Sequence, residues 1–399
     1  MTQITKLHGT KLEIADILRQ HIQDYKESYS LWPEQKKIVT NLTDCRTAHL
    51  GGYVERCNHC ETERVFYHSC RNRHCPKCQQ IPREKWLKAR KAELLPVAYF
   101  HVIFTLPHEL NPIVLSNKRV MLNILFKSVS ETLIRFGDNQ MGGKLGFIST
   151  LHTWDQVLKS HFHLHCLVAG GILSSDRKQW IPCKNDYLFN EEALSLVFRG
   201  KFIDKVNRAR KGDKLRIADD KYRQLKSKLY SKNWVVSVRD PIYQAQHVLE
   251  YIARYTHRVA IANSRLIELT DGMVTFSYKD RKNNTTETTT ISAANFIHRF
   301  FLHILPQRFV RIRHYGFLAN RNRKANLSRI RLLLKLPPQP DLGNASIEEM
   351  MLELTGVDIT RCPYCEKGQM IVVAEIPKGS GKHPNHLIRP PNYRLRPTG

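Results

Sequence analysis

The sequence predicts a mixed α+β fold preceded by a small cysteine-rich module, on three observations. Six of the ten cysteines lie close together, between positions 45 and 78. Segments rich in β-branched and aromatic residues, which are typical of strands, occupy residues 99–106, 146–154 and 162–169. Around these segments, apolar residues recur at the three- and four-residue spacing of a helix.

Four regions show this helical spacing: 1–40, 84–95, 116–136 and 241–256. The second is a basic amphipathic helix that ends at Pro96, because proline cannot continue a helix. A strand-like pair follows at about 266–279 and 286–292. Helices and strands are therefore expected along most of the chain.

The charge of the chain indicates a polyanionic partner. Its 399 residues carry 63 Lys and Arg against 36 Asp and Glu, a formal charge of 63 − 36 = +27. Such an excess most often serves nucleic-acid binding, and a merely solubilising surface needs less. No stretch approaches the roughly eighteen apolar residues of a membrane span. The N-terminus also lacks the layout of a secretory signal, so we expect neither a membrane nor a secreted protein.

The clustered cysteines indicate structural zinc, against the alternatives of chance occurrence or redox use. Cys57 and Cys60 form one CxxC turn, Cys75 and Cys78 form another, and fourteen residues lie between the two turns. Two such turns complete a tetrahedral four-thiolate site, which leaves no open position for catalysis. We therefore expect these four cysteines to bind one zinc ion.

The remaining cysteines leave alternatives open. Cys45 and Cys70 either hold a second zinc, with His49, His68 or His74, or are two buried thiols. Cys362 and Cys365 form a third CxxC turn without a visible partner pair, so it is half a site completed elsewhere or a simple turn. Near the cluster, Arg71 and Arg73 would present cations suited to phosphate contact.

Three histidines alternate with apolar residues in the segment SHFHLHCLVAGG. On a strand, His161, His163 and His165 point to one face. A lone histidine there would most often be a satisfied polar group. Three at period two are better explained by a divalent cation, which binds several imidazoles at once.

A helix further along carries two tyrosines. His247, Tyr251 and Tyr255 are spaced four residues apart and so share one helical face, with Arg254 and Arg258 beside them. The tyrosines either pack against the core or act as nucleophiles. A phenol, with a pKa near 10, is a poor nucleophile until a metal or base assists its ionisation, and a histidine-bound cation would do so.

These motifs together resemble those of HUH endonucleases. FTLPHEL, LHTWDQ, SHFHLHCLVAGG and YIARYTHRVAI occur in the order found in the two-tyrosine transposases of the insertion-sequence ninety-one family. That family also begins with a zinc domain ending in a stretch like SCRNRHCPKCQ. The resemblance covers about residues 10–335.

The resemblance implies an α+β HUH endonuclease domain, with a central antiparallel sheet flanked by helices and preceded by the zinc-binding module. The middle strand would present the histidines. It further implies single-stranded DNA cleavage, a 5′-phosphotyrosine intermediate and rolling-circle-like transposition in the bacterial cytoplasm, associated with the nucleoid. His163 and His165 match the family's histidine pair, and Tyr251 and Tyr255 match its tyrosines. The catalytic cation would be Mg²⁺ or Mn²⁺, with His247 or His161 as third ligand.

On this basis we expect DNA, mainly single-stranded transposon ends, as partner. ATP is not needed, because the phosphotyrosine conserves bond energy and no phosphate-cradling GxxxxGK[ST] loop is present. Phosphate contacts are assigned to basic residues near the tyrosines and in 308–335, a stretch with nine Lys and Arg and no acid: Arg254, His257, Arg258, Arg311, Arg313, Arg321 and Arg323. Tyr315 and Phe317 either stack on bases or, as favoured here, pack in the core.

The expected organisation comprises a helical segment 1–40, a zinc-binding domain 41–85, a catalytic domain 86–300 with a basic excursion 176–232, a basic DNA-binding segment 301–340, and a largely disordered tail 341–399 containing the CPYC motif. Two rival functions remain. A plasmid or phage rolling-circle replication initiator would share the chemistry. A non-catalytic zinc-dependent nucleic-acid-binding protein would use the histidines and tyrosines structurally.

Overall fold

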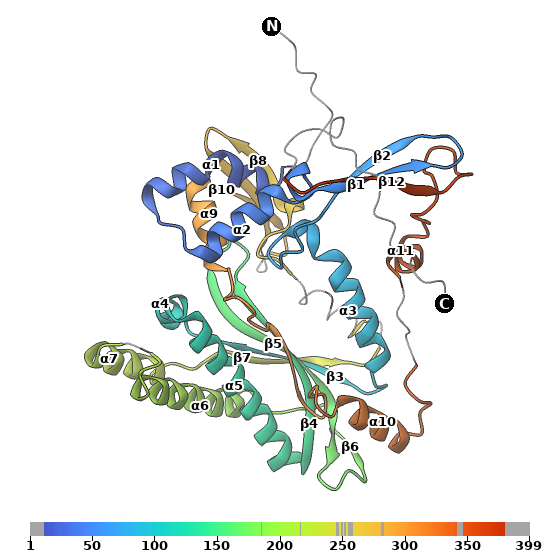
Figure 1. The fold of residues 1–399 in the computed structure, drawn as a ribbon. Coiled ribbons are helices and arrows are strands. Elements are labelled where there is room, and N and C mark those ends of the chain that lie inside the picture. Colours follow the sequence, from blue (N-terminus) through green and yellow to red (C-terminus); the bar gives the residue numbers. More distant parts are fainter. Residues whose placement is uncertain are drawn as a thin grey trace. The chain divides into compact units, whose positions relative to one another are not determined.

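The computed structural model describes residues 12–184, 186–215, 217–244, 247–248, 250, 253, 258–280, 283–340 and 346–379. The chain divides into two compact units (Figure 1). Of the described residues, the central unit comprises Leu12 and those from 81 to 340, and the terminal unit comprises 13–80 together with 346–379. None of the described helices is both long and apolar enough to span a membrane.

An antiparallel sheet of six strands forms the middle of the central unit. Its strands lie in the order β11-β4-β5-β3-β7, and β6 pairs with the far part of β5. The expected central antiparallel sheet is thus confirmed, and the histidine-bearing strand is its middle strand. The strands are β3 (Tyr99–Thr105), β4 (Gly143–Trp154), β5 (Ser160–Ser174), β6 (Trp180–Pro182), β7 (Val236–Ile242) and β11 (Ile312–Gly316).

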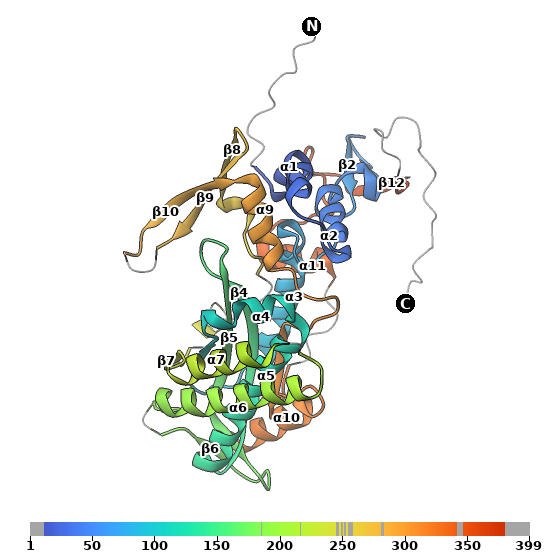
Figure 2. The ribbon, with the colours of Figure 1, turned by 90° about the vertical axis from the view of Figure 1, so that its left-hand side faces the viewer.

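Helices cover one face of this sheet, and the main apolar core lies between them. Alternate residues of β5, beginning with Phe162 and Leu164, pack into this core together with Phe100 and Phe104 of β3. Figure 2 shows the long helices in front of the strands. The described helices of this unit are α3 (Gln80–Glu93), α4 (Asn111–Ser116), α5 (Lys118–Phe136), α6 (Glu191–Lys211), α7 (Asp219–Tyr230), α9 (Ala293–Leu302) and α10 (Arg323–Leu333).

The basic excursion is part of this helical layer. Within the basic excursion 176–232, residues 199–232 carry 13 Lys and Arg against 4 Asp and Glu, which predicts either a charged helix or a mobile excursion, solvated in both cases. The structure has helices there, α6 and α7, but they fold onto the main core. Phe198 and Phe202, one turn apart on α6, are fully buried against Trp234. The charge count concealed this packing, because lysine and arginine occupy the outer helix faces while the sparse aromatic residues share the inner face.

The opposite face of the sheet has an apolar end and a polar end. At the apolar end, Tyr99, Ile148, Leu167 and Ala169 pack with residues of α3 and α10 and with fully buried Val248. Residues two positions apart on a strand share a face, so this is also the face of His163 and His165. The histidines therefore occupy the polar end of this sheet face, and Val248, from the 241–256 region, covers its apolar end.

The region 241–256 differs from its expected helix at the start. Strand β7 continues to Ile242, and helical backbone is described at residues 247, 248, 250 and 253. The strand-like pair beyond it is a three-stranded meander of β8 (Leu266–Thr270), β9 (Met273–Lys279) and β10 (Thr286–Ser292). Phe276 of β9 packs on Phe296 of α9.

The terminal unit pairs a strand from the C-terminal part of the chain with a hairpin from its N-terminal part. Helices α1 (Ile14–Ser28) and α2 (Pro33–Asp44) precede a hairpin of β1 (Gly52–Cys57) and β2 (Glu63–Tyr67), and β12 (Met370–Ile376) pairs with β1 in order β12-β1-β2. Helix α11 (Ile347–Thr355) precedes β12. The expectation of a largely disordered tail is therefore wrong for residues 346–379, because β1 provides β12 with a pairing edge and Val54 packs on Ala374 and Ile376.

Candidate active site and zinc sites

Four cysteines of the terminal unit form a first sulfur group: Cys45, Cys70, Cys75 and Cys78. Cys45 Sγ lies 3.5 Å from Cys78 Sγ and 3.6 Å from Cys75 Sγ, and Cys70 Sγ lies 3.7 Å from Cys78 Sγ. A tetrahedron of sulfurs around zinc, with Zn–S of about 2.3 Å, has edges of about 3.8 Å. All four thiols are free of disulfides. This spacing therefore fits a four-thiolate zinc site.

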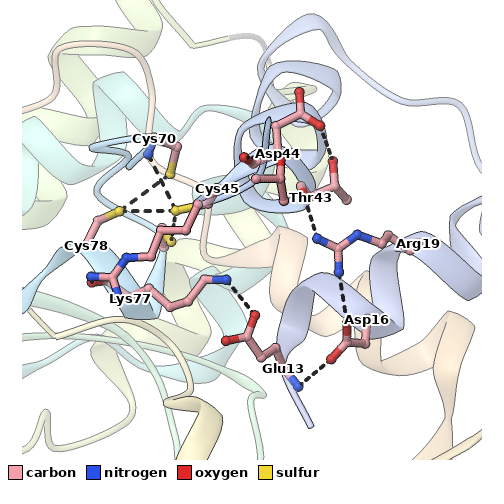
Figure 3. Close-up of polar contacts among 12 residues, drawn as sticks. Glu13, Asp16, Arg19, Thr43, Asp44, Cys45, Cys70, Lys77 and Cys78 are labelled. Atoms are coloured by element: carbon pink, nitrogen blue, oxygen red, sulfur yellow. Dashed lines mark hydrogen bonds and ion pairs between the residues drawn. The ribbon is translucent and has the colours of Figure 1, made fainter. Parts of the chain in front are cut away.

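Ion pairs and hydrogen bonds fix the surroundings of the first group (Figure 3). Lys77, between two of its cysteines, pairs with Glu13 at 2.6 Å, and Arg46 donates to the Lys77 carbonyl at 3.2 Å. The Cys70 backbone N–H donates to Cys45 Sγ at 3.4 Å. Arg46 and Arg71, each directly after a cysteine of the group, adopt positive φ angles of 59° and 51°. These left-handed residues turn the chain around the sulfur group.

A second sulfur group contains Cys57 and Cys60 together with Cys362 and Cys365. The expected union of Cys57 and Cys60 with Cys75 and Cys78 in one site is therefore wrong. Cys57 and Cys60 lie at the tip of the β1–β2 hairpin, five residues beyond the pair Gly52–Tyr67 at its base. At about 3.3 Å per residue, tip and base are roughly 17 Å apart, so one ion cannot bind cysteines at both.

Two histidines of β5 and one of β4 form a buried group in the central unit: His152, His163 and His165. His152 is the register partner of His163 on the neighbouring strand. One ring nitrogen from each histidine lies within 4.8 Å of the others. Of the expected ligands, His163 and His165 are thus together, and His152 joins them although it was not singled out from the sequence.

Neither of the two alternative third ligands joins the group, although the ring centroid of His161 lies 4.7 Å from that of His163. His161 is half-buried, and its ring stacks on His108 with centroids 5.5 Å apart. His247 is exposed in helical backbone. Neither belongs to a group of clustered metal-binding side chains among the described residues. His152 was identifiable as a histidine on an expected strand, but its contact with His163 depends on a strand register that the sequence does not state.

Hydrogen bonds orient the ring nitrogens of the histidine group. His163 Nδ1 lies 2.9 Å from the carbonyl oxygen of His161, which can only accept, so His163 carries its proton on Nδ1. Its Nε2 therefore presents a lone pair, 3.0 Å from Nε2 of His165. Nδ1 of His165 lies 2.8 Å from Nε2 of His101 on β3. Burial, with the nearby Arg239 charge, lowers the pKa of His101 to about 3, so that ring is neutral at ordinary pH.

The facing Nε2 atoms of His163 and His165, with His152 beside them, could bind a divalent cation. If His165 carries its proton on Nδ1, it donates to His101, and the Nε2 atoms of both β5 histidines could then act as metal ligands. His101 is a second residue that sequence analysis missed. It is on an expected strand, but only the register with β5 brings it to His165.

Comparisons with known proteins identify the family of the chain. Residues 17–106 match the model of the transposase zinc-binding domain, and residues 146–326 match a family model described as putative transposase. A putative transposase of Sinorhizobium fredii is 42% identical over 376 residues, covering 90% of this chain and 94% of the relative. The chain belongs to this transposase family. The transposase for insertion sequence element IS801 of Pseudomonas savastanoi pv. phaseolicola is 27% identical over 359 residues, covering 85% of this chain and 83% of that protein. No solved structure matches.

Both tyrosines of the transposase, Tyr251 and Tyr255, lie outside the described residues, as do Arg254 and His257. The nearest described residues around them are His247, Val248, Glu250, Ala253 and Arg258. The nucleophile assignment therefore remains a prediction from the sequence.

The remaining arginines expected on DNA have different environments. Arg258 is exposed, and its carbonyl accepts a hydrogen bond from Arg311 at 2.6 Å. Arg313 lies over the Phe126 ring at 4.0 Å and donates to Asn123, and Arg323 pairs with Glu93 at 3.1 Å. Arg321 is exposed. The head groups of Arg313 and Arg323 thus have partners within the protein.

Two further basic and aromatic assignments depend on burial. In the zinc-binding domain Arg71 is exposed, whereas burial lowers the pKa of Arg73. Tyr315 stacks on Phe147 with centroids 5.1 Å apart, and Phe317 is almost fully buried. The two aromatics therefore pack in the core, as the sequence favoured, which leaves Arg71 as the exposed member of the zinc-domain pair.

Proposed function

We propose that this transposase cleaves and rejoins single-stranded DNA through a metal-assisted 5′-phosphotyrosine intermediate, in rolling-circle-like transposition. The observation that carries the proposal is the buried group of His152, His163 and His165 on a sheet face whose far end is covered by Val248. Val248 belongs to the sequence region that contains both tyrosines, three residues before Tyr251. This anchor supports an approach of the tyrosine segment to the histidine face.

The donor set fits Mg²⁺ or Mn²⁺, and His152, His163 and His165 would hold it. A bound divalent cation would polarise the scissile phosphate and stabilise charge on the leaving oxygen. Imidazole ligands favour Mn²⁺ over Mg²⁺, which prefers oxygen ligands. We therefore choose Mn²⁺ as the first metal for experiments.

The protein's own chemistry in this proposal is a pair of transesterifications. The hydroxyl of one tyrosine loses its proton and attacks the phosphorus. The bond from phosphorus to the 3′ oxygen breaks, and that oxygen takes up a proton to leave as a 3′-hydroxyl. In rejoining, a 3′-hydroxyl attacks the phosphotyrosine and the phenol is released. The number of phosphoester bonds is unchanged, so no ATP is consumed, and the second tyrosine allows another strand to be cut while the first remains attached.

Oligonucleotide cleavage tests this chemistry and its polarity. A single-stranded transposon end labelled on the 3′ side of the cleavage point should give a labelled covalent adduct that depends on added Mn²⁺. The same strand labelled at its 5′ end should give a free fragment ending in a 3′-hydroxyl. The double change Tyr251→Phe and Tyr255→Phe should abolish the adduct, whereas Tyr230→Phe, an exposed tyrosine of α7, should leave it intact. An adduct that survives in the double variant refutes the tyrosine assignment.

For DNA contact, we propose the exposed guanidinium groups, with Arg258 and Arg321 foremost. Affinity should fall steeply with salt, because each neutralised phosphate releases counterions. Arg321→Ala should reduce the slope of log affinity against log salt by about 1, uniformly across sequences. Arg323→Ala is the matched comparison. Because Arg323 pairs with Glu93, its loss should leave the slope nearly unchanged. Equal slopes for wild type and Arg321→Ala would rule out that contact.

A further inference from the structure

We infer that Cys57, Cys60, Cys362 and Cys365 bind a second structural zinc ion, which fastens the C-terminal segment 346–379 to the N-terminal zinc-binding domain. The family model for that domain ends at residue 106 and contains only half of these ligands. The other half comes from the CPYC turn, 302 residues from Cys60 to Cys362 along the chain. The site is distinct from the Cys45 group, with which it shares no cysteine.

The distances between the sulfurs have the spacing that zinc requires. Cys57 Sγ lies 3.7 Å from Cys365 Sγ, and Cys60 Sγ lies 3.7 Å from Cys362 Sγ. These contacts join one turn to the other, close to the roughly 3.8 Å edge of a zinc–thiolate tetrahedron and far beyond a disulfide bond of about 2.05 Å. Four thiols at this spacing indicate that they share a cation.

The two CxxC turns are built alike. In each, the residue after the second cysteine is a glutamate with positive φ, 58° for Glu61 and 56° for Glu366. The N–H of Glu61 donates to the Cys57 carbonyl at 3.2 Å, and that of Glu366 to the Cys362 carbonyl at 3.0 Å. Equivalent turns facing each other present two pairs of sulfurs to one point, which a single chance turn would not do.

Backbone N–H groups also point at the sulfurs. Cys57 Sγ accepts from the N–H of His59 at 3.4 Å and of Cys60 at 3.5 Å, and Cys365 Sγ accepts from Gly368 at 3.5 Å. Hydrogen bonds of this kind stabilise thiolate, the form of cysteine that binds zinc. Donors of this kind are present at both turns.

The approach of the two turns requires a glycine and is continued by strand pairing. A Cβ atom on Gly368 would lie 2.5 Å from Cys57 Sγ, closer than any side chain allows. Asn58 N–H donates to the Gln369 carbonyl at 3.0 Å, and the Gln369 N–H donates back to Asn58 Oδ1 at 2.8 Å. Beyond them β12 runs along β1, with Met370 opposite Cys57. The sulfur group thus terminates a continuous ladder.

The inferred zinc changes how the chain is assembled. The central unit is an insertion between residues 80 and 342 of the terminal unit. With zinc bound, the two segments of the terminal unit that flank this insertion are cross-linked to each other. Because half of the ligands follow the insertion, this zinc site is completed only after the whole central unit has been synthesised. Its binding free energy then adds to folding free energy, as in other structural zinc sites.

Zinc content of the full-length protein provides the first test. Wild type should contain two zinc ions per chain, and the variant Cys362→Ser with Cys365→Ser should contain one. Cys365→His should retain two, because three cysteines and one histidine also form a zinc site. Cys183→Ser, which changes a half-buried thiol outside both groups, should retain two. One zinc in wild type, or two in the double serine variant, would overturn the inference.

Thiol reactivity provides a second test that does not depend on zinc counting. Cys60 is exposed, so without a metal its thiol should react quickly with an alkylating reagent. In wild type it should be protected, and in the variant Cys362→Ser with Cys365→Ser it should become reactive while Cys45 and Cys75 remain protected. Protection of the Cys45 group also shows that the variant has folded. Rapid labelling of Cys60 in zinc-replete wild type would refute a bound metal at this site.

Discussion

His101 provides a sharp test of the histidine group, because it contacts the group without belonging to it. In the proposed metal-bound state, His165 binds through Nε2 and donates its Nδ1 proton to His101, 2.8 Å away. The change His101→Phe removes this acceptor and leaves a buried N–H without a partner, since both rings are buried. An unsatisfied buried donor costs about 1–3 kcal/mol. A change of about 1.4 kcal/mol in binding free energy changes the affinity tenfold.

We therefore expect His101→Phe to weaken Mn²⁺ binding by about ten- to a hundredfold, the range usual for partners of metal-binding histidines. Calorimetric titration of Mn²⁺ into zinc-loaded protein measures this. His101→Gln keeps an acceptor and should lose less. The matched control is His314→Phe, which changes a half-buried histidine whose pKa is likewise lowered by burial to about 3, but which contacts Arg90. Unchanged affinity in His101→Phe, or an equal loss in the control, would refute this hydrogen-bond role.

Two further predictions concern folding. His303 is buried, donates from Nε2 to the Leu158 carbonyl at 3.0 Å and lies 3.2 Å from Thr153 Oγ1. Burial lowers its pKa to about 4. The unfolded chain, with a histidine pKa near 6.5, therefore binds more protons between these values, so stability should fall by up to about 3 kcal/mol as pH drops from 6.5 to 4. Urea unfolding should show a shallower fall for His303→Gln, and an unchanged pH dependence would exclude this residue as a cause. In thermal unfolding, Gly146→Ala should destabilise the protein by about 1–3 kcal/mol, because its Cβ would lie 2.4 Å from the Phe317 ring. Gly200→Ala, in open space on α6, should instead stabilise the protein by about 0.5–1 kcal/mol. Equal effects of the two changes would contradict the packing at Phe317.

Three strands of the central sheet, β3, β4 and β5, were predictable because local sequence determines them, whereas β6, β7 and β11 were not predicted. β3 was expected at 99–106 and runs from Tyr99 to Thr105, and the helix expected at 116–136 is α5 from Lys118 to Phe136. Long runs of β-branched residues or of helically spaced apolar residues decide such elements with little help from distant contacts. The alternation of β5 also correctly placed His163 and His165 on one face.

Contacts between elements were not predictable in the same way. His152 was visible on an expected strand, but only the register of β4 against β5 makes it the partner of His163. Similarly, the spacing of Cys57 and Cys75 is that of one zinc site, yet the hairpin between them carries Cys57 away from the second cysteine pair. Sequence spacing limits which residues can meet, whereas strand pairing decides which of them do.

The histidine group also has a consequence for stability. Alternation on β5 places His163 and His165 on the same sheet face as Leu167 and Ala169, and His152 of β4 is buried beside them. Two facing Nε2 atoms 3.0 Å apart share at most one proton when the rings are neutral. A cation bound by both atoms would replace this single hydrogen bond with two metal–nitrogen bonds, and a ligand that binds only the folded state stabilises it, so Mn²⁺ should stabilise the fold.

At a free concentration a hundred times its dissociation constant, Mn²⁺ should add about 2.7 kcal/mol to the unfolding free energy. Unfolding of zinc-loaded protein in increasing Mn²⁺ measures this, with zinc content checked at each step so that displacement from the cysteine sites is not mistaken for the effect. His152→Ala removes one ligand and should abolish most of the Mn²⁺-dependent gain. If wild type gains nothing, or if His152→Ala gains as much as wild type, these buried imidazoles are held by protein contacts alone and the case for a metal-assisted cleavage site loses its structural basis.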